Sequence, residues 1–224
     1  MKNLALFDLD HTLLPIDSDY EWGEFLVRVG AVDETAFRRR NDEFFAEYQA
    51  GVLNPHVYLE FALGTLARFP RAQLDALYAQ YMAEVIEPAI RPSALKLVRG
   101  HQEAGDLVAI ITATNYHITA PIAARFGVEH HLGAMAEYDA QGNLTGKLVG
   151  TPTSGPGKIT HMHAWLERLG ARFEDFERCY FYSDSHNDLP LLSIVSHPVA
   201  TNPSSRLAAH AQAQGWPTIH LFND

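Results

Sequence analysis

Two acidic residues follow an apolar run near the start of the chain. In "LALFDLDHTLL" (4–14), Asp8 and Asp10 come directly after four apolar residues. If the run is a strand, both carboxylates project to the same side, about 6.6 Å apart at roughly 3.3 Å per residue. Carboxylates this close repel each other unless a cation or a shared proton relieves them. The pair therefore predicts a site for a hard cation such as Mg²⁺, although a strand-end residue and a turn former would explain the same two acids.

A second pair of acids lies in "CYFYSDSHND" (179–188). Asp188 would be a good N-cap for the helix expected over "LPLLSIV", with Pro190 in its first turn. A cap explains one acid but not two. Asp184 directly follows an apolar run and would meet Asp8 if the two strands are neighbours. A cluster of up to four acids would then need a cation.

Lys158 stands at the start of an expected helix, in "SGPGKIT". A positive charge in the first turn opposes the helix dipole by some tenths of a kcal/mol, so the lysine is expected to have an acid or a phosphate as its partner. A P-loop is excluded, because that motif needs glycine where Pro152 stands and serine or threonine where Ile159 stands.

Thr112 follows the apolar run that begins at residue 107. Its hydroxyl and the free amides of Ala113 and Thr114 could hold phosphate oxygens. A polar turn at the end of a strand explains the same residues equally well. The twelve histidines are scattered, and the neighbouring pairs at 130–131 and 161–163 lack the spacing of a zinc site.

These side chains must be positioned by a parallel sheet. The runs 4–10, 107–115 and 179–188 are short and show little alternation, as expected for strands covered on both faces. In an open α/β sheet, ligands bind at the carboxyl ends of the strands. Helical patterns separate the runs, so we predict a doubly wound α/β fold. Further helices are expected over 92–105, 158–170 and the segment from 188, with "HPVATN" and "PTIHLF" as strands around the helix "SSRLAAHAQAQG".

A helical module interrupts this alternation. No strand pattern occurs in 17–88, which reads as four consecutive helices over 17–30, 33–51, 54–69 and 70–86, the last ending before a proline. We therefore expect a catalytic core made of residues 1–16 and 89–224, with 17–88 as an inserted helical cap. A hairpin is expected over 134–150, turning at 141–143.

Composition narrows the class of protein. The chain has 224 residues, of which 47% are hydrophobic and 20% charged, as in a folded globular protein. A net charge of -10 with only four lysines argues against a nucleic-acid surface. The single cysteine, Cys179, excludes an internal disulfide and is expected to be buried and inert. The N-terminus does not resemble a signal peptide and no run of about 18 apolar residues occurs, so we expect a cytoplasmic protein with no membrane partner.

Taken together, the motifs resemble those of the haloacid dehalogenase-like (HAD) superfamily, in the subfamily that includes phosphoserine phosphatase. "FDLDHTLL" is similar to the first motif, "IITATN" to the second, "GPGK" to the third and "YSDSHNDLPLL" to the fourth. The similarity spans essentially the whole chain, with the motifs in the right order. The residues that carry it are Asp8, Asp10, Thr12, Thr112, Lys158, Asp184 and Asp188.

The resemblance implies a modified Rossmann core with a helical cap inserted after the first motif. It also implies a Mg²⁺-dependent phosphatase that hydrolyses a small phosphomonoester, with Asp8 attacking phosphorus and Asp10 acting as general acid and then base. Related dehalogenases lack the second of these acids. The remaining implied roles are Mg²⁺ ligands (Asp8, the Asp10 backbone carbonyl and Asp184), support for the metal site (Asp188) and phosphoryl binding (Thr112, Ala113 and Lys158).

The identity of the substrate depends on the cap. Phosphoserine phosphatases have an acid early in the cap, a role that Asp17 could fill, although a simple N-cap explains it as well. They also have an arginine for the substrate carboxylate, and Ala62 stands where it is expected. Histidinol phosphate is therefore preferred to phosphoserine. The candidate pocket residues are Asp17, Glu21, Trp22, Tyr58 and Phe61, whose aromatic members could equally be core residues.

Two alternatives stay open. A receiver-type signalling domain also groups strand-end aspartates, a threonine and a lysine around Mg²⁺, but it would accept a phosphoryl group without turnover. The helical insertion, and an acid two residues after the nucleophile, argue against it. A non-catalytic binding protein could also keep this fold. The sequence does not fix the oligomeric state.

Overall fold

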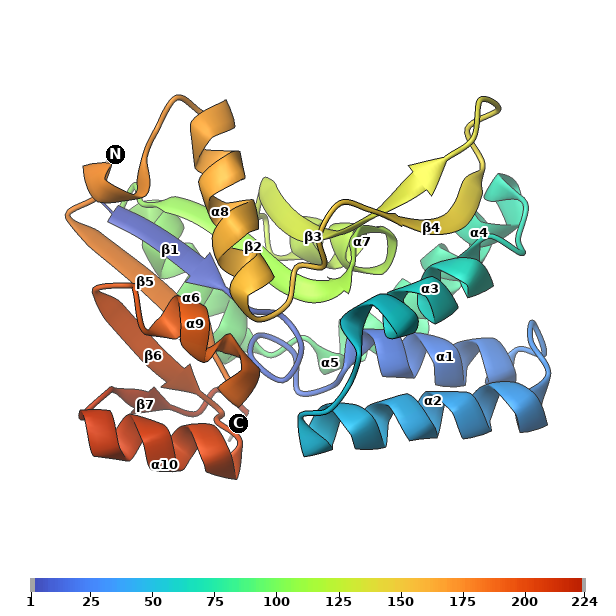
Figure 1. The fold of residues 1–224 in the computed structure, drawn as a ribbon, viewed down its shortest axis with the longest axis horizontal. Helices are drawn as coiled ribbons and strands as arrows, with labels where there is room; N and C mark the ends of the chain where they lie inside the picture. Colours follow the sequence, from blue (N-terminus) through green and yellow to red (C-terminus); the bar gives the residue numbers. More distant parts are fainter. Residues whose placement is uncertain (1–2, 223–224) are drawn as a thin grey trace.

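The computed structural model describes residues 3–222, which form one seven-stranded sheet with helices on both faces (Figure 1). The strand order is β4-β3-β2-β1-β5-β6-β7, and every neighbouring pair is parallel except β3 and β4. The predicted α/β fold is therefore confirmed. The strands are β1 (Asn3–Phe7), β2 (Leu107–Asn115), β3 (His130–Tyr138), β4 (Leu144–Val149), β5 (Arg178–Ser183), β6 (His197–Thr201) and β7 (Thr218–Ile219).

The central strand is apolar on both faces because each face is covered by helices. The covering helices are α6 (Pro92–Glu103), α7 (Tyr116–Arg125), α8 (Pro156–Arg168), α9 (Leu189–Leu192) and α10 (Ser205–Gln214), with short 3₁₀ turns at Phe173–Asp175 and His186–Asp188. Leu4 and Leu6 of β1 pack in one core with residues of α8, α9 and α10, whereas Ala5 and Phe7 pack in a second core with residues of α6 and α7. This arrangement explains why the run shows so little alternation.

Helices alone connect β1 to α6, and they lie beyond the carboxyl ends of the strands, on the right in Figure 1. The side chains of Asp33 and Asn54 cap two of these helices, as their positions in the sequence indicate. The segments are α1 (Ser18–Arg28), α2 (Glu34–Ala50), α3 (Pro55–Leu66), α4 (Arg71–Tyr81), a π-helical turn (Met82–Ile86) and α5 (Glu87–Ala89).

The ends of several elements differ from the prediction. β1 stops at Phe7 instead of residue 10, because the chain turns back at Leu9, whose carbonyl accepts the amides of residues 12, 13 and 14. β2, by contrast, has the predicted bounds, Leu107–Asn115. The last helix of the insertion continues through Pro88, which a helix tolerates here because the proline falls in the first turn of α5.

One helix is missing from the prediction. α7 follows β2 directly and is capped by the side chain of Asn115, which accepts the amide of Ile118. β3 also begins earlier than the predicted hairpin, because His130 and His131 pair in parallel with β2 before the strand turns to β4. No helix within residues 3–222 is long and apolar enough to cross a membrane.

Candidate active site

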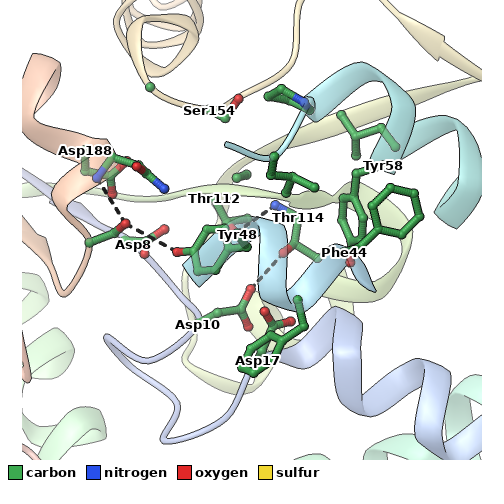
Figure 2. A pocket seen from close by; sticks show the side chains of 18 of the residues that line it. Asp8, Asp10, Asp17, Phe44, Tyr48, Tyr58, Thr112, Thr114, Ser154 and Asp188 are labelled. Carbon is green, nitrogen blue, oxygen red and sulfur yellow. Dashed lines mark hydrogen bonds between the residues drawn. The ribbon is translucent and has the colours of Figure 1, made fainter. Parts of the chain in front are cut away.

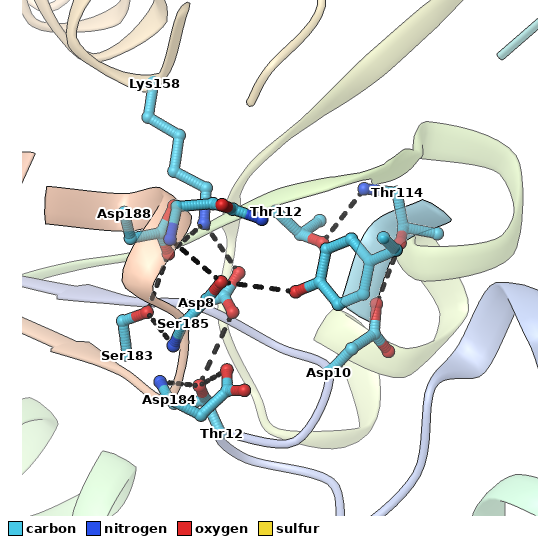
Figure 3. A network of polar contacts seen from close by, with 12 residues as sticks. Asp8, Asp10, Thr12, Thr112, Thr114, Lys158, Ser183, Asp184, Ser185 and Asp188 are labelled. Carbon is cyan, nitrogen blue, oxygen red and sulfur yellow. Dashed lines mark hydrogen bonds and ion pairs between the residues drawn. The ribbon is translucent and has the colours of Figure 1, made fainter. Parts of the chain in front are cut away.

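The pairing of β1 with β5 brings the first and fourth motifs together. Phe7 lies opposite Tyr182, and the amide of Asp8 donates to the Tyr182 carbonyl at 2.9 Å. Asp184 is therefore next to Asp8, as the sequence predicts for neighbouring strands. The Thr12 hydroxyl lies between the two carboxylates, 3.0 Å from Asp184 Oδ1 and 3.4 Å from Asp8 Oδ2 (Figure 3).

Lys158 reaches into this group of acids from the first turn of α8. Its Nζ lies 2.7 Å from Asp8 Oδ1 and 2.7 Å from Asp188 Oδ2, and its side chain is 2% exposed. Burial alone would lower the pKa of Lys158, but the charges of Asp188 and Asp8 outweigh it and raise the pKa. Gly157 makes this close turn possible, because a side chain there would collide with the carbonyl of Pro152.

Asp188 is a partner of the lysine rather than a helix cap. Its side chain makes no capping hydrogen bond to α9; besides Lys158, it accepts a hydrogen bond of 2.7 Å from the Ser183 hydroxyl. The contacts with Lys158 and Ser183 hold the Asp188 carboxylate in place beside the lysine ammonium group. Asp188 therefore fixes where Lys158 can place its charge.

The charge balance of this group suits a divalent cation. Asp8, Asp184 and Asp188 are buried carboxylates, and Lys158 is the one cation that bonds to the group among the described residues. Burial raises the pKa of Asp8 to about 6 and, together with the Asp8 charge, raises that of Asp184 well above its usual range. A bound cation would relieve both carboxylates.

The carboxylates of this group would suit a magnesium ion better than a metal that is held by side chains alone. Within residues 3–222 no three His, Cys, Asp or Glu side chains are grouped closely enough to hold a metal ion by themselves. Mg²⁺ is usually held by one or two carboxylates, with water and phosphate oxygens in the other positions. Asp8 and Asp184 are such a pair, so the residues present fit this ion.

Asp10 occupies a different environment from the other motif acids. Its Oδ1 accepts the amide of Ser18 at 2.8 Å and its Oδ2 accepts the Thr114 hydroxyl at 2.8 Å. Burial and the nearby charge of Asp17 raise the pKa of Asp10 to about 6. The carboxyl is thus held in one orientation and retains a proton more readily than an exposed aspartate does.

A cavity of about 430 Å³ opens onto these groups (Figure 2). Thr112, Ala113 and Lys158 line it, as expected for groups that would contact a phosphate, and the Thr112 hydroxyl accepts the amide of Thr114 at 3.1 Å. The opposite wall comes from the helical insertion. Its polar and aromatic members include Asp17, Tyr20, Asn41, Phe44, Phe45, Tyr48 and Tyr58.

Only two of the five proposed substrate residues, Asp17 and Tyr58, line this cavity. Trp22 is 3% exposed and packs against Tyr78 and Tyr81 in the core of the helical insertion. Phe61 stacks on other rings of the insertion, and Glu21 lies outside the wall. Their assignment to the pocket is corrected: α1 and α3 turn these side chains away from it.

Sequence reasoning missed the contribution of α2. Asn41, Phe44, Phe45 and Tyr48 all face the cavity, and the Tyr48 hydroxyl donates to Ser185 Oγ at 3.3 Å across to the loop after β5. Their spacing of three and four residues marks a single helix face, which is the signal that could have identified them. Asp17 is both a wall residue and the N-cap of α1, so the two interpretations of this residue are compatible.

Comparisons with known proteins agree with this geometry. The haloacid dehalogenase-like hydrolase model matches residues 5–193, which include all four motifs. The chain belongs to the haloacid dehalogenase-like hydrolase family. A histidinol-phosphatase of Neisseria meningitidis is 42% identical over 221 residues, which cover 99% of this chain and 100% of that protein. A phosphoserine phosphatase of Mycobacterium tuberculosis is 40% identical over 218 residues, 95% of this chain and 68% of that protein.

Two solved structures share the fold. A protein of unknown function from Bordetella pertussis Tohama I superposes with a TM-score of 0.94 at 48% identity, covering 99% of this chain and 100% of that one. A substrate-bound phosphoserine phosphatase superposes with a TM-score of 0.67 at 17% identity, covering 100% and 95%, which speaks for the fold alone. The predicted family and enzyme class, a hydrolase of the phosphatase type, are confirmed.

Proposed function

We propose that this protein hydrolyses a small phosphomonoester with a cationic leaving group, histidinol phosphate being the best candidate, through a phosphoryl group carried on Asp8. The observation that supports the substrate is the lining of the cavity. Among the described residues that line the cavity, Lys158 is the one basic side chain. Asp17 and several aromatic rings line the wall that the helical insertion contributes.

The leaving group is the part of the substrate that meets this wall. A carboxylate, as in phosphoserine, would find no arginine there, and Lys158, which contacts Asp8 and Asp188, is placed to bind the phosphoryl group instead. An ammonium or imidazolium group would find the carboxylate of Asp17 and the half-buried rings of Tyr20, Phe45 and Tyr58. The cavity therefore favours a cation over an anion, and the relative named histidinol-phosphatase is consistent with that choice.

The proposed reaction has two steps. A carboxylate oxygen of Asp8 attacks phosphorus, the bond from phosphorus to the ester oxygen breaks, and Asp10 gives its proton to the departing alkoxide. Asp10 then takes a proton from a water molecule, whose oxygen attacks the phosphoryl group. The bond between phosphorus and Asp8 breaks, which releases inorganic phosphate and restores both aspartates.

The neighbouring side chains hold the groups that react. Lys158 and the Thr112 hydroxyl would bind phosphoryl oxygens, with Asp188 fixing the lysine. Mg²⁺, held by Asp8, Asp184 and the Asp10 backbone carbonyl, would neutralise phosphoryl charge. Asp10 keeps its side chain free of this cluster, because Ser18 and Thr114 orient it separately.

A panel of phosphomonoesters tests the proposal. We expect Mg²⁺-dependent release of phosphate that is fastest with histidinol phosphate, slower with phosphoserine and abolished by a chelator. Turnover of phosphoserine far above all other esters would contradict the substrate. A single phosphorylation per chain without turnover would instead favour a phospho-acceptor role, and no reaction with any ester would favour a binding protein.

A further inference from the structure

A buried carboxylate outside the four motifs links the helical insertion to the sheet. Asp19, in the first turn of α1, is 5% exposed. Its Oδ2 accepts the Tyr58 hydroxyl of α3 at 2.6 Å, and its Oδ1 accepts the side-chain amide of Asn115, at the end of β2, at 3.2 Å. Asp19 does not line the cavity, so it is not placed to bind a substrate itself.

The two residues that donate hydrogen bonds to Asp10 each stand directly before one partner of the bond between Asp19 and Asn115. Ser18, whose amide donates to Asp10, directly precedes Asp19. Thr114, whose hydroxyl donates to the other oxygen of Asp10, directly precedes Asn115. The bond between Asp19 and Asn115 thus spans the same two segments that grip Asp10, one step further along each of them.

We propose that Asp19 is a positioning residue that holds the Asp10 carboxyl in line with the leaving oxygen, by fixing the distance between the Ser18 amide and the Thr114 hydroxyl. This inference rests on the proposed function, in which Asp10 protonates the leaving group. Without the Asp19 contact, the two donors are free to separate, and Asp10 loses the orientation that proton transfer requires.

Tyr58 extends this role to the substrate. Its ring lines the cavity (Figure 2), and its hydroxyl donates to Asp19. The ring also packs edge-on against Phe44, with centroids 5.2 Å apart. A leaving group bound against this wall would therefore contact Tyr58, the residue whose hydroxyl bonds to Asp19. Substrate binding and the orientation of Asp10 are coupled through one side chain.

Loss of a residue that positions the general acid should slow esters with poor leaving groups more than esters with good ones, whereas loss of a packing residue should slow both alike. A general acid matters most when the leaving group is a poor one, such as an alkoxide, and little when the leaving group is the stable p-nitrophenolate. The specificity constant kcat/KM includes the step in which the leaving group departs but not the later hydrolysis of the phosphoryl-enzyme. The ratio of two kcat/KM values from one preparation is also independent of the folded fraction.

The experiment compares histidinol phosphate with p-nitrophenyl phosphate in Asp19→Leu and Tyr58→Phe. Both variants stay close in size to the residue replaced: leucine cannot accept the hydrogen bonds of Asn115 and Tyr58, and phenylalanine lacks the hydroxyl that reaches Asp19. We expect kcat/KM for histidinol phosphate to fall about 10- to 100-fold and that for p-nitrophenyl phosphate by less than about 3-fold, a part of the gain that general acids provide. Tyr78→Phe is the matched control, since that buried hydroxyl has no hydrogen-bond partner among residues 3–222.

Equal losses on both esters would overturn the positioning role and leave Asp19 a residue that supports the fold. An unchanged ratio in Asp19→Leu, with wild-type rates, would overturn it as well. One further result would refute the proposed function and not the role of Asp19 alone. If the wild-type enzyme released phosphate from neither ester, the proposed function itself would fail, and the role of Asp19 with it.

Discussion

Thr12 and Asp184 bind each other through two hydrogen bonds of opposite direction. The Thr12 hydroxyl donates to Asp184 Oδ1 at 3.0 Å, and the Asp184 amide donates to Thr12 Oγ1 at 3.0 Å. The two residues are separated by 172 positions in the chain and belong to the loops that follow β1 and β5. The pair therefore fixes the separation of the Asp8 and Asp184 carboxylates before any ligand binds.

Thr12→Val should weaken Mg²⁺ binding. The valine is close in size to threonine but leaves the buried Asp184 amide without its acceptor and frees the carboxylate to move. We expect about a 10- to 100-fold loss of Mg²⁺ affinity, as is typical when a partner of a metal ligand is removed. Titration calorimetry with Mg²⁺ measures it. Thr12→Ser keeps the hydroxyl and should stay within about 3-fold of wild type; an equal loss in both variants would contradict the account.

Lys158→Met should destabilise the fold when Mg²⁺ is absent. The change leaves Asp8 and Asp188 buried without their cation, which typically costs about 3 to 5 kcal/mol. Urea unfolding in a chelator measures this loss in the free energy of unfolding. Added Mg²⁺ should recover part of it, because the ion would pair with Asp8. Unchanged stability in the chelator would show that the lysine does not balance these acids.

Asp17→Asn should reduce the preference for a cationic substrate. Asparagine caps a helix about as well as aspartate, so α1 should keep its N-terminus. Losing a charged partner costs about 1.5 to 3 kcal/mol, or about 10- to 100-fold in kcat/KM for histidinol phosphate. The reference is p-nitrophenyl phosphate, whose leaving group carries no positive charge, and its kcat/KM should change little. Parallel losses on both esters would place Asp17 outside the binding of the leaving group.

The stability of the protein should fall in acid partly because of His131. Burial lowers the pKa of this histidine from 6.5 to about 4. The unfolded chain therefore binds more protons between these values, and stability is lost as the pH drops through that window. At pH 5 the loss is on the order of 2 kcal/mol, at 1.36 kcal/mol per pH unit.

His131→Gln removes the titrating group and tests this loss. Urea unfolding at pH 7.5 and pH 5 should show a smaller decrease in the free energy of unfolding for the variant than for wild type. His131→Gln should also alter the starting stability, because the ring nitrogen bonds to the Thr119 hydroxyl at 2.7 Å, so only the difference between the two pH values counts. An identical decrease in both proteins would assign the acid sensitivity elsewhere.

The sequence predicts the polar ends of the strands better than the surfaces between elements. Asp8 and Asp184 could be grouped because parallel strands align their carboxyl ends, a rule that needs no side-chain detail. The same reasoning placed Asp10 beside Asp8 on an extended strand. The chain instead turns at Leu9, and Asp10 finds its partners on α1 and β2. Lys158, at the start of α8, was expected only to have an acid or a phosphate as its partner.

Tertiary packing decides what local patterns leave open. α7 is weak as a helix pattern because Pro121 interrupts it, yet contacts with β2 and β3 hold it in place. Trp22 and Phe61 have the chemistry of a substrate pocket, but helix rotation turns them into the core of the insertion. The spacing of Tyr48 within α2 marks a helix face, but only the structure shows that this face lies against the loop after β5.

The phosphoryl-enzyme is the central claim, and rapid quenching with acid tests it most directly. The wild-type enzyme mixed with histidinol phosphate and Mg²⁺ should yield a peptide phosphorylated on Asp8 when the quenched protein is digested and analysed by mass spectrometry. Asp8→Asn should give neither that peptide nor release of phosphate, while still binding the ester. Hydrolysis by Asp8→Asn at the wild-type rate, or a phosphoryl group found on another residue, would contradict the account.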